Sequence, residues 1–347
     1  MAPKRKNADR TARLPDLSRL LDLVSTFTRQ TVIVLGDFVV DEYVTGEISR
    51  VSREAPVLIL RHKQTEIVPG GGGNAANNLA DLGAHVLPIG AVGDDAAGGA
   101  LIDYFRRKRV DVSGIIRARG WTTTTKTRYL ARWTHTARHQ VLRVDREPEK
   151  ELPASAVAAI VRKCRVRIGQ SNAVIVSDYG AGSVTPQLLK RLRLKTVTLD
   201  SRHRLLDYRG VHLTAATPNE PELEALYHAR IGDNRRSLET LGRRTLRVLG
   251  LGALLVTRGK DGMVLFEKSK PPYEIGVYGS ADAVDVTGAG DAVIAVFTLA
   301  LAAGASFVEA AHLANYAGGI VVMKRGTATV TRSELEAAIR GEATAGA

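Results

Sequence analysis

The sequence has one cysteine, Cys164, few aromatic residues (5%) and no long apolar run among its 347 residues. A single cysteine rules out an intrachain disulfide. No apolar run reaches the roughly 18 residues that suggest a membrane-spanning helix, so we expect a cytoplasmic protein that does not enter a membrane. The few aromatic residues form no stacking pattern among the basic ones, which argues against a nucleic-acid-binding surface.

Basic residues outnumber acidic ones by 49 to 36, which gives a formal net charge of +13. Such a charge favours any polyanion, whether nucleic acid, membrane or nucleotide, and does not choose among them. Part of the excess lies in the first 13 residues. We expect residues 1–20 to form a disordered basic tail and residues 21–347 to form one large domain. Nucleic-acid binding by Lys4, Arg5 and Lys6 is the less favoured alternative.

Short apolar segments recur along the chain as candidate buried strands, at residues 31–35, 85–92, 173–177, 196–199 and 254–256. Helix-like stretches separate most of them. This alternation is typical of an α/β protein with a mostly parallel central sheet.

Two segments, at residues 42–68 and 122–145, break this alternation because they are rich in Thr, Val, Tyr and charged residues with a partial two-residue period. They predict exposed strands outside the main sheet, which would form a small β lid over one end of the body. Nearer the C-terminus, residues 289–303 carry almost no charge and predict a buried helix.

The most informative run is DVTGAGD at residues 285–291, directly before the apolar helix. Gly288, Ala289 and Gly290 are small, so they leave the backbone amides at the helix start uncovered, and such amides attract phosphate. Asp291, in the first helical turn, is placed to accept the proton of an attacking hydroxyl. The run therefore predicts phosphoryl transfer with Asp291 as the base. A glycine-rich turn with a merely helix-stabilising Asp is the alternative.

The same run resembles the second signature of the ribokinase-like (PfkB) sugar kinases, and the segment that begins with Gly70, Gly71, Gly72, Gly73 and Asn74 resembles the first. The resemblance covers roughly residues 30–340. It implies a ribokinase-like three-layer α/β fold with a mostly parallel central sheet and a small β lid. It also implies ATP and Mg²⁺ as cofactors, a homodimer paired through the lids, and in some relatives a monovalent cation near the residues equivalent to Asp285 and Thr287.

The resemblance assigns the acceptor site to the loop that holds Gly71, Gly72 and Asn74, together with Asp37. An acidic acceptor and an amide suit the recognition of sugar hydroxyls. Taken singly, Asp37 and Asn74 are equally typical of ordinary turns.

The resemblance places Asn219, Thr257, Gly259 and Asn315 on the nucleotide side, with residues 326–328 nearby. It makes Glu222 the carboxylate that organises Mg²⁺ through water. Without the resemblance, Asn219 is equally a helix N-cap and Glu222 a partner of the helix dipole.

Within the family, residues 36–57 resemble the opening of the bacterial heptose 7-phosphate kinases, which make a mannoheptose 1,7-bisphosphate on the route to ADP-heptose. A phosphorylated acceptor needs cationic partners, and the candidates are Lys126, Arg128, Arg143 and Arg202. Two positions depart from this subgroup: Ser201 and Arg202 replace its Pro-Lys after Asp200, and Ala181 replaces a lysine. A kinase for another sugar or sugar phosphate is therefore the alternative.

Other classes of protein fit less well. Gly71, Gly73 and Ala76 spell GxGxxA, which suggests a dinucleotide-dependent oxidoreductase, but the run before them is charged rather than a buried strand. His135 and His139 lie in the predicted lid, where metal binding is not expected. The chain has no Walker P-loop, so any kinase chemistry depends on the helix-terminal anion hole.

Overall fold

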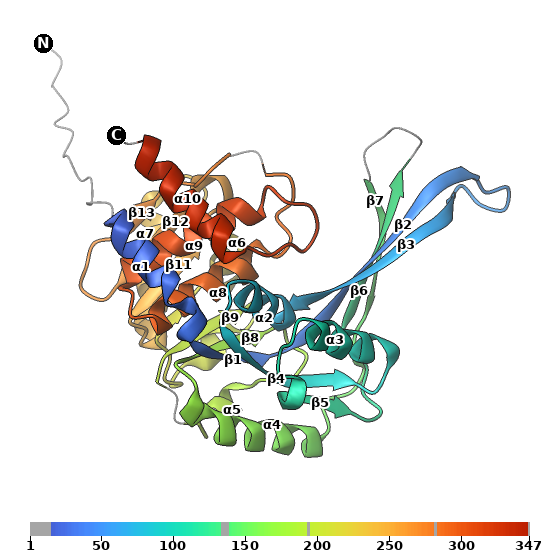
Figure 1. The fold of residues 1–347 in the computed structure, drawn as a ribbon, viewed down its shortest axis with the longest axis horizontal. Coiled ribbons are helices and arrows are strands. Elements are labelled where there is room, and N and C mark those ends of the chain that lie inside the picture. The colour runs from blue at the N-terminus through green and yellow to red at the C-terminus, as the bar shows by residue number, and fades with distance from the viewer. Residues whose placement is uncertain (1–14, 133–138, 193–194, 281–282, 346–347) are drawn as a thin grey trace, which may run out of the picture.

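The computed structural model describes residues 15–132, 139–192, 195–280 and 283–345. A large body is built on a nine-stranded sheet, and a separate four-stranded sheet projects from one end of it (Figure 1). Within the described residues, no helix is both long and apolar enough to cross a membrane.

The body sheet has the strand order β13-β12-β11-β10-β9-β8-β1-β4-β5. The seven strands from β11 to β5 pair in parallel, whereas β12 and β13 are antiparallel additions at one edge. Its strands are β1 Thr31–Gly36, β4 His85–Gly93, β5 Ile115–Ala118, β8 Ala173–Asp178, β9 Val197–Ser201, β10 Ala215–Ala216, β11 Ala253–Thr257, β12 Met263–Glu267 and β13 Tyr273–Ile275.

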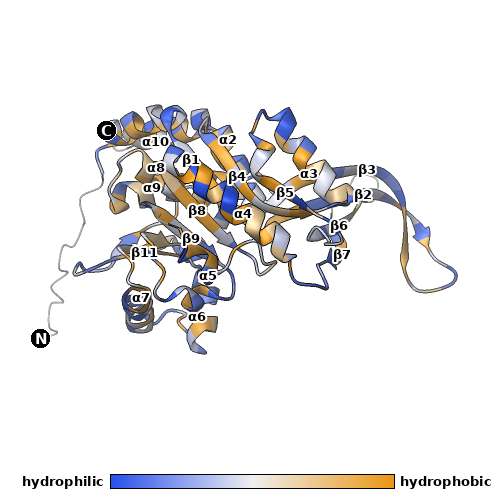
Figure 2. Ribbon diagram, turned by 90° about the horizontal axis from the view of Figure 1, so that it is seen from below, coloured by the Kyte–Doolittle hydropathy of each residue, from blue (hydrophilic) through white to orange (hydrophobic). Residues whose placement is uncertain are grey.

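Helices cover both faces of this sheet. In β1, Val32 and Val34 pack into one core while Ile33 and Leu35 pack into the other, as the two-residue period of a strand requires. The first core is completed by α1 Leu17–Ser25, α2 Gly72–Asp81, α3 Ala96–Arg107, α8 Ala289–Ala302, α9 Phe307–Val321 and α10 Arg332–Ala345. The second is completed by α4 Ala154–Arg167, α5 Pro186–Leu189, α6 Glu220–Tyr227 and α7 Arg235–Leu249. The hydrophobic strands lie between these helix layers (Figure 2).

The predicted three-layer α/β fold is therefore confirmed, and α8 is the predicted buried helix. The predicted tail is too long, because its boundary at residue 20 falls inside α1. Asp16 caps α1, and Leu20, Leu23 and Val24 are buried against the body, so the chain is ordered before residue 20. Residues 1–14, including Lys4, Arg5 and Lys6, lie outside the described residues.

The second sheet, which we call the lid sheet, consists of β2 Phe38–Val51, β3 Leu58–Gly71, β6 Thr125–Arg132 and β7 His139–Arg146 in the order β3-β2-β6-β7. Both segments predicted to form a lid contribute to it. β2 starts two residues after β1 ends, and β3 runs directly into α2. The lid sheet is therefore anchored in the body at the carboxyl end of β1.

Candidate active site

The turn before α8 adopts the shape expected of an anion hole. Gly288 is the N-cap of α8 with a φ of 81°, and no side chain among the described residues caps this helix end. The turn is fixed by Asp285, whose carboxylate accepts the backbone N–H of Thr287 at 2.9 Å. Of the amides at this helix start, Ala289 N–H donates to the Val286 carbonyl at 3.3 Å. The described residues show no backbone or side-chain acceptor for Gly290 N–H, which is therefore left for a ligand, as phosphate binding requires.

Asp291 lies in that first turn, and its side chain is buried. It is only 6% exposed. Its carboxylate accepts one hydrogen bond from Asn74 Nδ2 at 2.9 Å and one from the Tyr179 hydroxyl at 3.0 Å. Burial raises the pKa of Asp291 to about 7, although both hydrogen bonds lower it. A carboxylate with a pKa near neutrality suits a general base.

Asn74 links the two family signatures in space. It lies in the first turn of α2, fully buried, and its amide also approaches the Gly288 carbonyl at 3.4 Å. A Cβ on Gly288 would lie 2.6 Å from Asn74 Nδ2, so only glycine fits there. In this structure the Asn74 amide donates to Asp291 and approaches the Gly288 carbonyl; its contact with a sugar stays a prediction.

Tyr179 reaches Asp291 because Asp37 fixes the loop after β8. The buried Asp37 carboxylate accepts backbone N–H groups from Tyr179, Ala181 and Ser183 at 2.8–3.0 Å. Direct contact between Asp37 and a sugar also stays a prediction. Gly71 has a φ of 55°, and a Cβ on it would lie 3.2 Å from the Tyr179 ring. Gly72 N–H donates to the Asp37 carbonyl, which joins the predicted glycine loop to this arrangement.

One side of the α8 turn opens on a cavity of about 590 Å³, within the usual size of ligand pockets. Its wall includes Asn219, Thr257, Gly259 and Asn315, the four residues predicted for the nucleotide. Ala289 and Gly290 form part of the same wall. We call it the nucleotide-side cavity.

Glu222 forms a capping box with Asn219, in which each side chain bonds the other's backbone N–H. Burial raises the pKa of Glu222. Burial, together with the carboxylates of Glu222, Asp291 and Asp178, raises the pKa of Asp200 well above its usual value. Acidic groups therefore crowd this side of the site. Among the described residues, no three metal-binding side chains lie close enough to hold an ion directly.

The four predicted phosphate-binding cations do not form one cluster. Arg143 and Lys126 both pair with Asp145, at 2.5 Å and 3.3 Å. The Arg143 hydrogen bond lowers the pKa of Asp145 to about 2. Arg128 pairs with Asp41 on the same face of the lid sheet. Arg202 is exposed on the body, where its charge lowers the pKa of Asp200 and Glu222 against the effect of burial.

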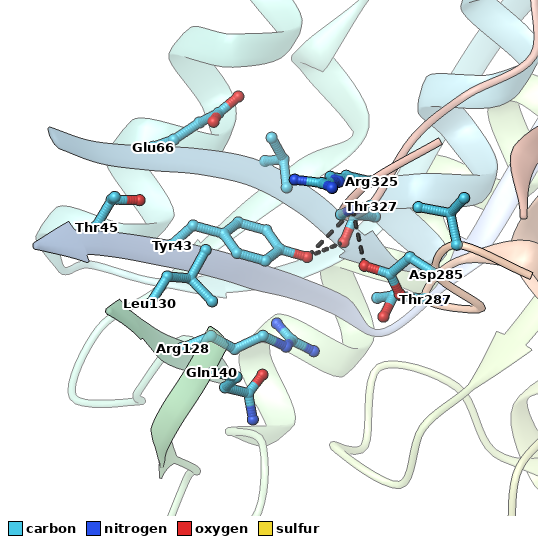
Figure 3. Close-up of a pocket in the computed structure, with 13 residues that line it drawn as sticks. Tyr43, Thr45, Glu66, Arg128, Leu130, Gln140, Asp285, Thr287, Arg325 and Thr327 are labelled. Carbon is cyan, nitrogen blue, oxygen red and sulfur yellow. Dashed lines mark hydrogen bonds between the residues drawn. The ribbon is translucent and has the colours of Figure 1, made fainter. Parts of the chain in front are cut away.

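A second cavity, of about 670 Å³, lies between the lid sheet and two loops of the body (Figure 3). We call it the lid-side cavity. Its lining includes Tyr43, Arg128 and Gln140 from the lid sheet, and Thr287 and Thr327 from the body loops. The α8 turn therefore separates two cavities, with Thr287 on one side and Ala289 and Gly290 on the other.

The sequence matches the pfkB family of carbohydrate kinases over residues 30–334. This chain is a member of that family. The pfkB assignment accounts for the α8 turn and confirms the predicted carbohydrate kinase. The oxidoreductase alternative fails structurally as well, because its glycine run follows β3 of the lid sheet rather than a buried parallel strand.

Named relatives of this pfkB member include Bifunctional protein HldE of Desulfatibacillum aliphaticivorans, 40% identical over 325 residues, and that of Geobacter sulfurreducens, 39% identical over 310 residues. These matches cover 92% and 87% of this chain, but only 65% and 61% of the relatives. Solved structures with the same fold include Arabidopsis thaliana ribokinase complexed with ribose and ATP (TM-score 0.68, 20% identity, 89% of this chain and 98% of that one). Phosphofructokinase-2 from Escherichia coli in complex with potassium also matches (TM-score 0.71, 16% identity, 90% and 99%).

Tyr179 is the site residue that sequence reasoning did not single out. Its one local signal is its place directly after the buried strand β8, where parallel strands present functional groups. Its bond to Asp291 joins residues 112 positions apart, which no local pattern reveals. His135 lies outside the described residues, and His139 is exposed at the start of β7.

Proposed function

We propose that this kinase transfers the γ-phosphoryl group of ATP to the anomeric hydroxyl of a mannoheptose 7-phosphate, in the cytoplasm and on the route to ADP-heptose. The observation that carries the phosphoryl-transfer part is the buried Asp291 carboxylate, with a pKa of about 7, beside the uncapped amides of the α8 turn. Base and anion hole thus occupy adjacent residues between two cavities.

In the proposed reaction, ATP occupies the nucleotide-side cavity with its γ-phosphoryl group at the amides of residues 288–290. Asp291 accepts the proton of the acceptor hydroxyl as that oxygen bonds to phosphorus and the bond from phosphorus to the ADP oxygen breaks. The amides stabilise charge on the transferring phosphoryl oxygens. Asn74 and Tyr179 hold the Asp291 carboxylate toward the acceptor.

Mg²⁺ would be held here through water and the nucleotide phosphates, as this ion commonly is, with Glu222 and Asp200 as the nearby acidic groups. Glu222 keeps one carboxylate oxygen outside its capping box, and Asp200 lies close enough for their charges to interact. When bound, Mg²⁺ would neutralise phosphate charge. A monovalent cation near Asp285 and Thr287 stays a prediction; the Asp285 carboxylate there accepts N–H groups from Thr287 and Gly326.

The heptose 7-phosphate acceptor is supported by the resemblance of residues 36–57 and by the identity of 34–40% to proteins named HldE. The departures at Ala181 and Arg202 weigh against it, and they make another sugar or sugar phosphate the second candidate. For a phosphorylated acceptor, the candidate cations are Arg202 and those of the lid sheet, which in this structure pair with Asp41 and Asp145.

The test is ADP release by the purified protein with MgATP and one acceptor at a time: mannoheptose 7-phosphate, fructose 6-phosphate, fructose, ribose, adenosine or none. We expect the heptose phosphate to give the highest kcat/KM. Turnover confined to another acceptor would move the protein to a different branch of the family and leave the Asp291 chemistry in place. ADP release that no acceptor stimulates would contradict the proposal.

We also propose a homodimer that pairs through the lid sheets. Every residue of the edge strand β7 is exposed, and the apolar side chains of Val141, Leu142 and Val144 are 42–55% exposed. An edge strand that displays apolar side chains is a ready surface for pairing with another chain.

A further inference from the structure

A three-residue contact joins the lid sheet to the body. The Tyr43 hydroxyl of β2 lies 2.8 Å from Thr327 Oγ1 and accepts the Thr327 backbone N–H at 3.1 Å (Figure 3). Thr327 Oγ1 also lies 3.0 Å from the Asp41 carboxylate. We call Asp41, Tyr43 and Thr327 the latch. It joins residues 284 to 286 positions apart in sequence.

The loop that carries Thr327 also shapes the anion-hole turn. Gly326 N–H donates to the Asp285 carboxylate at 2.9 Å, and the other oxygen of that carboxylate accepts the Thr287 N–H. A Cβ on Gly288 would lie 3.3 Å from the Thr327 methyl group, so Thr327 packs against the N-cap of α8. A shift of Thr327 would therefore change the position of the uncapped amides at the start of α8.

The same loop continues to α2, whose Asn74 donates a hydrogen bond to Asp291. Thr329 Oγ1 donates to Asp81 at 2.6 Å, and Val330 N–H donates to Asn78 Oδ1 at 3.1 Å. Asn78 in turn donates to the Asn74 carbonyl at 3.0 Å. Residues 326–330 thus contact both the α8 turn and the second half of α2.

The lid half of the latch is itself held in place. Arg128 pairs with Asp41, and its guanidinium lies 5.4 Å from the centre of the Tyr43 ring. Burial raises the pKa of Tyr43, so its hydroxyl stays protonated at neutral pH. These contacts orient the hydroxyl without requiring a bound ligand.

We propose that Tyr43 and Thr327 are positioning residues for phosphoryl transfer: the latch couples the seating of the lid sheet to the geometry of the anion hole. This inference rests on the proposed roles of the α8 turn and Asp291. Hydrogen-bond donors must be fixed to within a fraction of an ångström to stabilise a transferring group. Release of the latch should therefore slow turnover more than it weakens nucleotide binding.

The experiment compares Tyr43→Phe and Thr327→Val, which each remove one hydroxyl, with the double variant and with Thr327→Ser, which keeps the hydroxyl. Tyr129→Phe is the matched control, because Tyr129 lies one residue from Arg128 on the neighbouring strand and therefore on the opposite face of the lid sheet. The kcat, the KM for ATP and the Tm are measured with MgATP and mannoheptose 7-phosphate, and again with fructose 6-phosphate. Asp291→Asn is the reference for the proposed chemistry.

We expect kcat to fall about tenfold in Tyr43→Phe and in Thr327→Val, with the KM for ATP changed less than about twofold. The double variant should lose no more than the larger single loss, because the two hydroxyls act together. Thr327→Ser should keep most of the turnover, and Tyr129→Phe should match the wild type.

Turnover within about twofold of wild type in Tyr43→Phe, beside a strongly impaired Asp291→Asn, would overturn the latch alone. The latch would also be overturned if Thr327→Ser lost as much turnover as Thr327→Val, or if the two single losses multiplied in the double variant. Normal turnover of Asp291→Asn would instead contradict the proposed function. A drop in Tm that Tyr129→Phe shared would indicate a merely structural effect on the lid sheet.

Discussion

At the scale of single residues, Asp291 is held between two opposing influences. Burial favours the neutral acid, while the hydrogen bonds from Asn74 and Tyr179 favour the carboxylate. The result is a pKa of about 7, so the base form is populated at neutral pH yet still binds a proton readily.

The first prediction concerns the acid limb of the pH profile. Because the base must be ionised, kcat/KM should rise with pH to a plateau above about 7. The Tyr179 hydrogen bond lowers the pKa of Asp291, so Tyr179→Phe should move this limb to higher pH. Tyr208→Phe is the control, since it removes a buried hydroxyl from Asp178 instead. An unmoved limb in Tyr179→Phe would contradict the assignment.

The second prediction is a gain in stability when the base is removed. A carboxyl whose pKa is raised in the folded state binds its proton more tightly there, so stability falls as pH rises from about 4 to about 7. Ionised Asp291 thus costs the folded state up to about 4 kcal/mol. An Asn side chain can accept from Asn74 and donate to the Tyr179 hydroxyl.

Asp291→Asn should accordingly have a higher Tm than the wild type at pH 8, with a difference that shrinks toward pH 4. Thermal unfolding of both proteins across this range is the measurement. A difference that grew toward acid pH would mean that the pKa of Asp291 is lowered by folding rather than raised.

At the scale of secondary-structure elements, the α8 turn and α2 are built to approach each other closely. Gly288 has a φ of 81° and faces the Asn74 amide, whereas a Cβ on Gly290 would have no neighbour within 4 Å. Residue 288 must therefore be glycine both for its backbone angle and for its close contact with Asn74. Neither reason applies at residue 290.

The third prediction compares substitutions at Gly288 and Gly290. Gly288→Ala should lower the free energy of unfolding by at least about 1–2 kcal/mol, because an L-residue is strained at this φ and its Cβ would displace Asn74. Gly290→Ala should leave stability unchanged or slightly improved, as replacing glycine within a helix does. Urea unfolding of both variants measures the difference. Equal stability of the two would contradict the close approach of α2 and α8.

Much at this scale was predictable, because the relevant signals are local. The apolar runs predicted the main strands, and the DVTGAGD run predicted the start of α8, which has no side-chain cap among the described residues. Helix α1 is hard to predict because its apolar residues follow a strongly basic segment, although Asp16 is a suitable N-cap. In the folded protein, α1 is stabilised by the packing of Leu20 and Val24 on the body.

At the scale of the whole molecule, the features that escaped prediction depend on residues far apart in the chain. The latch, the Tyr179 bond to Asp291, and the pairing of Lys126 with Asp145 each bring separate segments together. Sequence alone showed the cations but not that Lys126 and Arg143 share the Asp145 carboxylate. The approach of Lys126 to Asp145 depends on the register of β6 and β7 in the lid sheet, which places the two residues opposite each other.

The fourth prediction concerns assembly. Leu142 and Val144 lie on the face of β7 opposite Arg143, and both are exposed. The wild type should be a dimer in solution, and Leu142→Lys with Val144→Lys should convert it to a monomer by placing charge in the pairing surface. Size-exclusion chromatography with light scattering measures the mass. A monomeric wild type at micromolar concentration would contradict the proposed pairing.

The central claim is that Asp291 is the base of a phosphoryl transfer at the α8 turn. Its most direct test is turnover of Asp291→Asn with MgATP and mannoheptose 7-phosphate, measured together with ATP binding by calorimetry. The account predicts a fall in kcat of about 10² to 10⁴, the usual contribution of a general base, with ATP affinity close to that of the wild type. Turnover near the wild-type rate would contradict it.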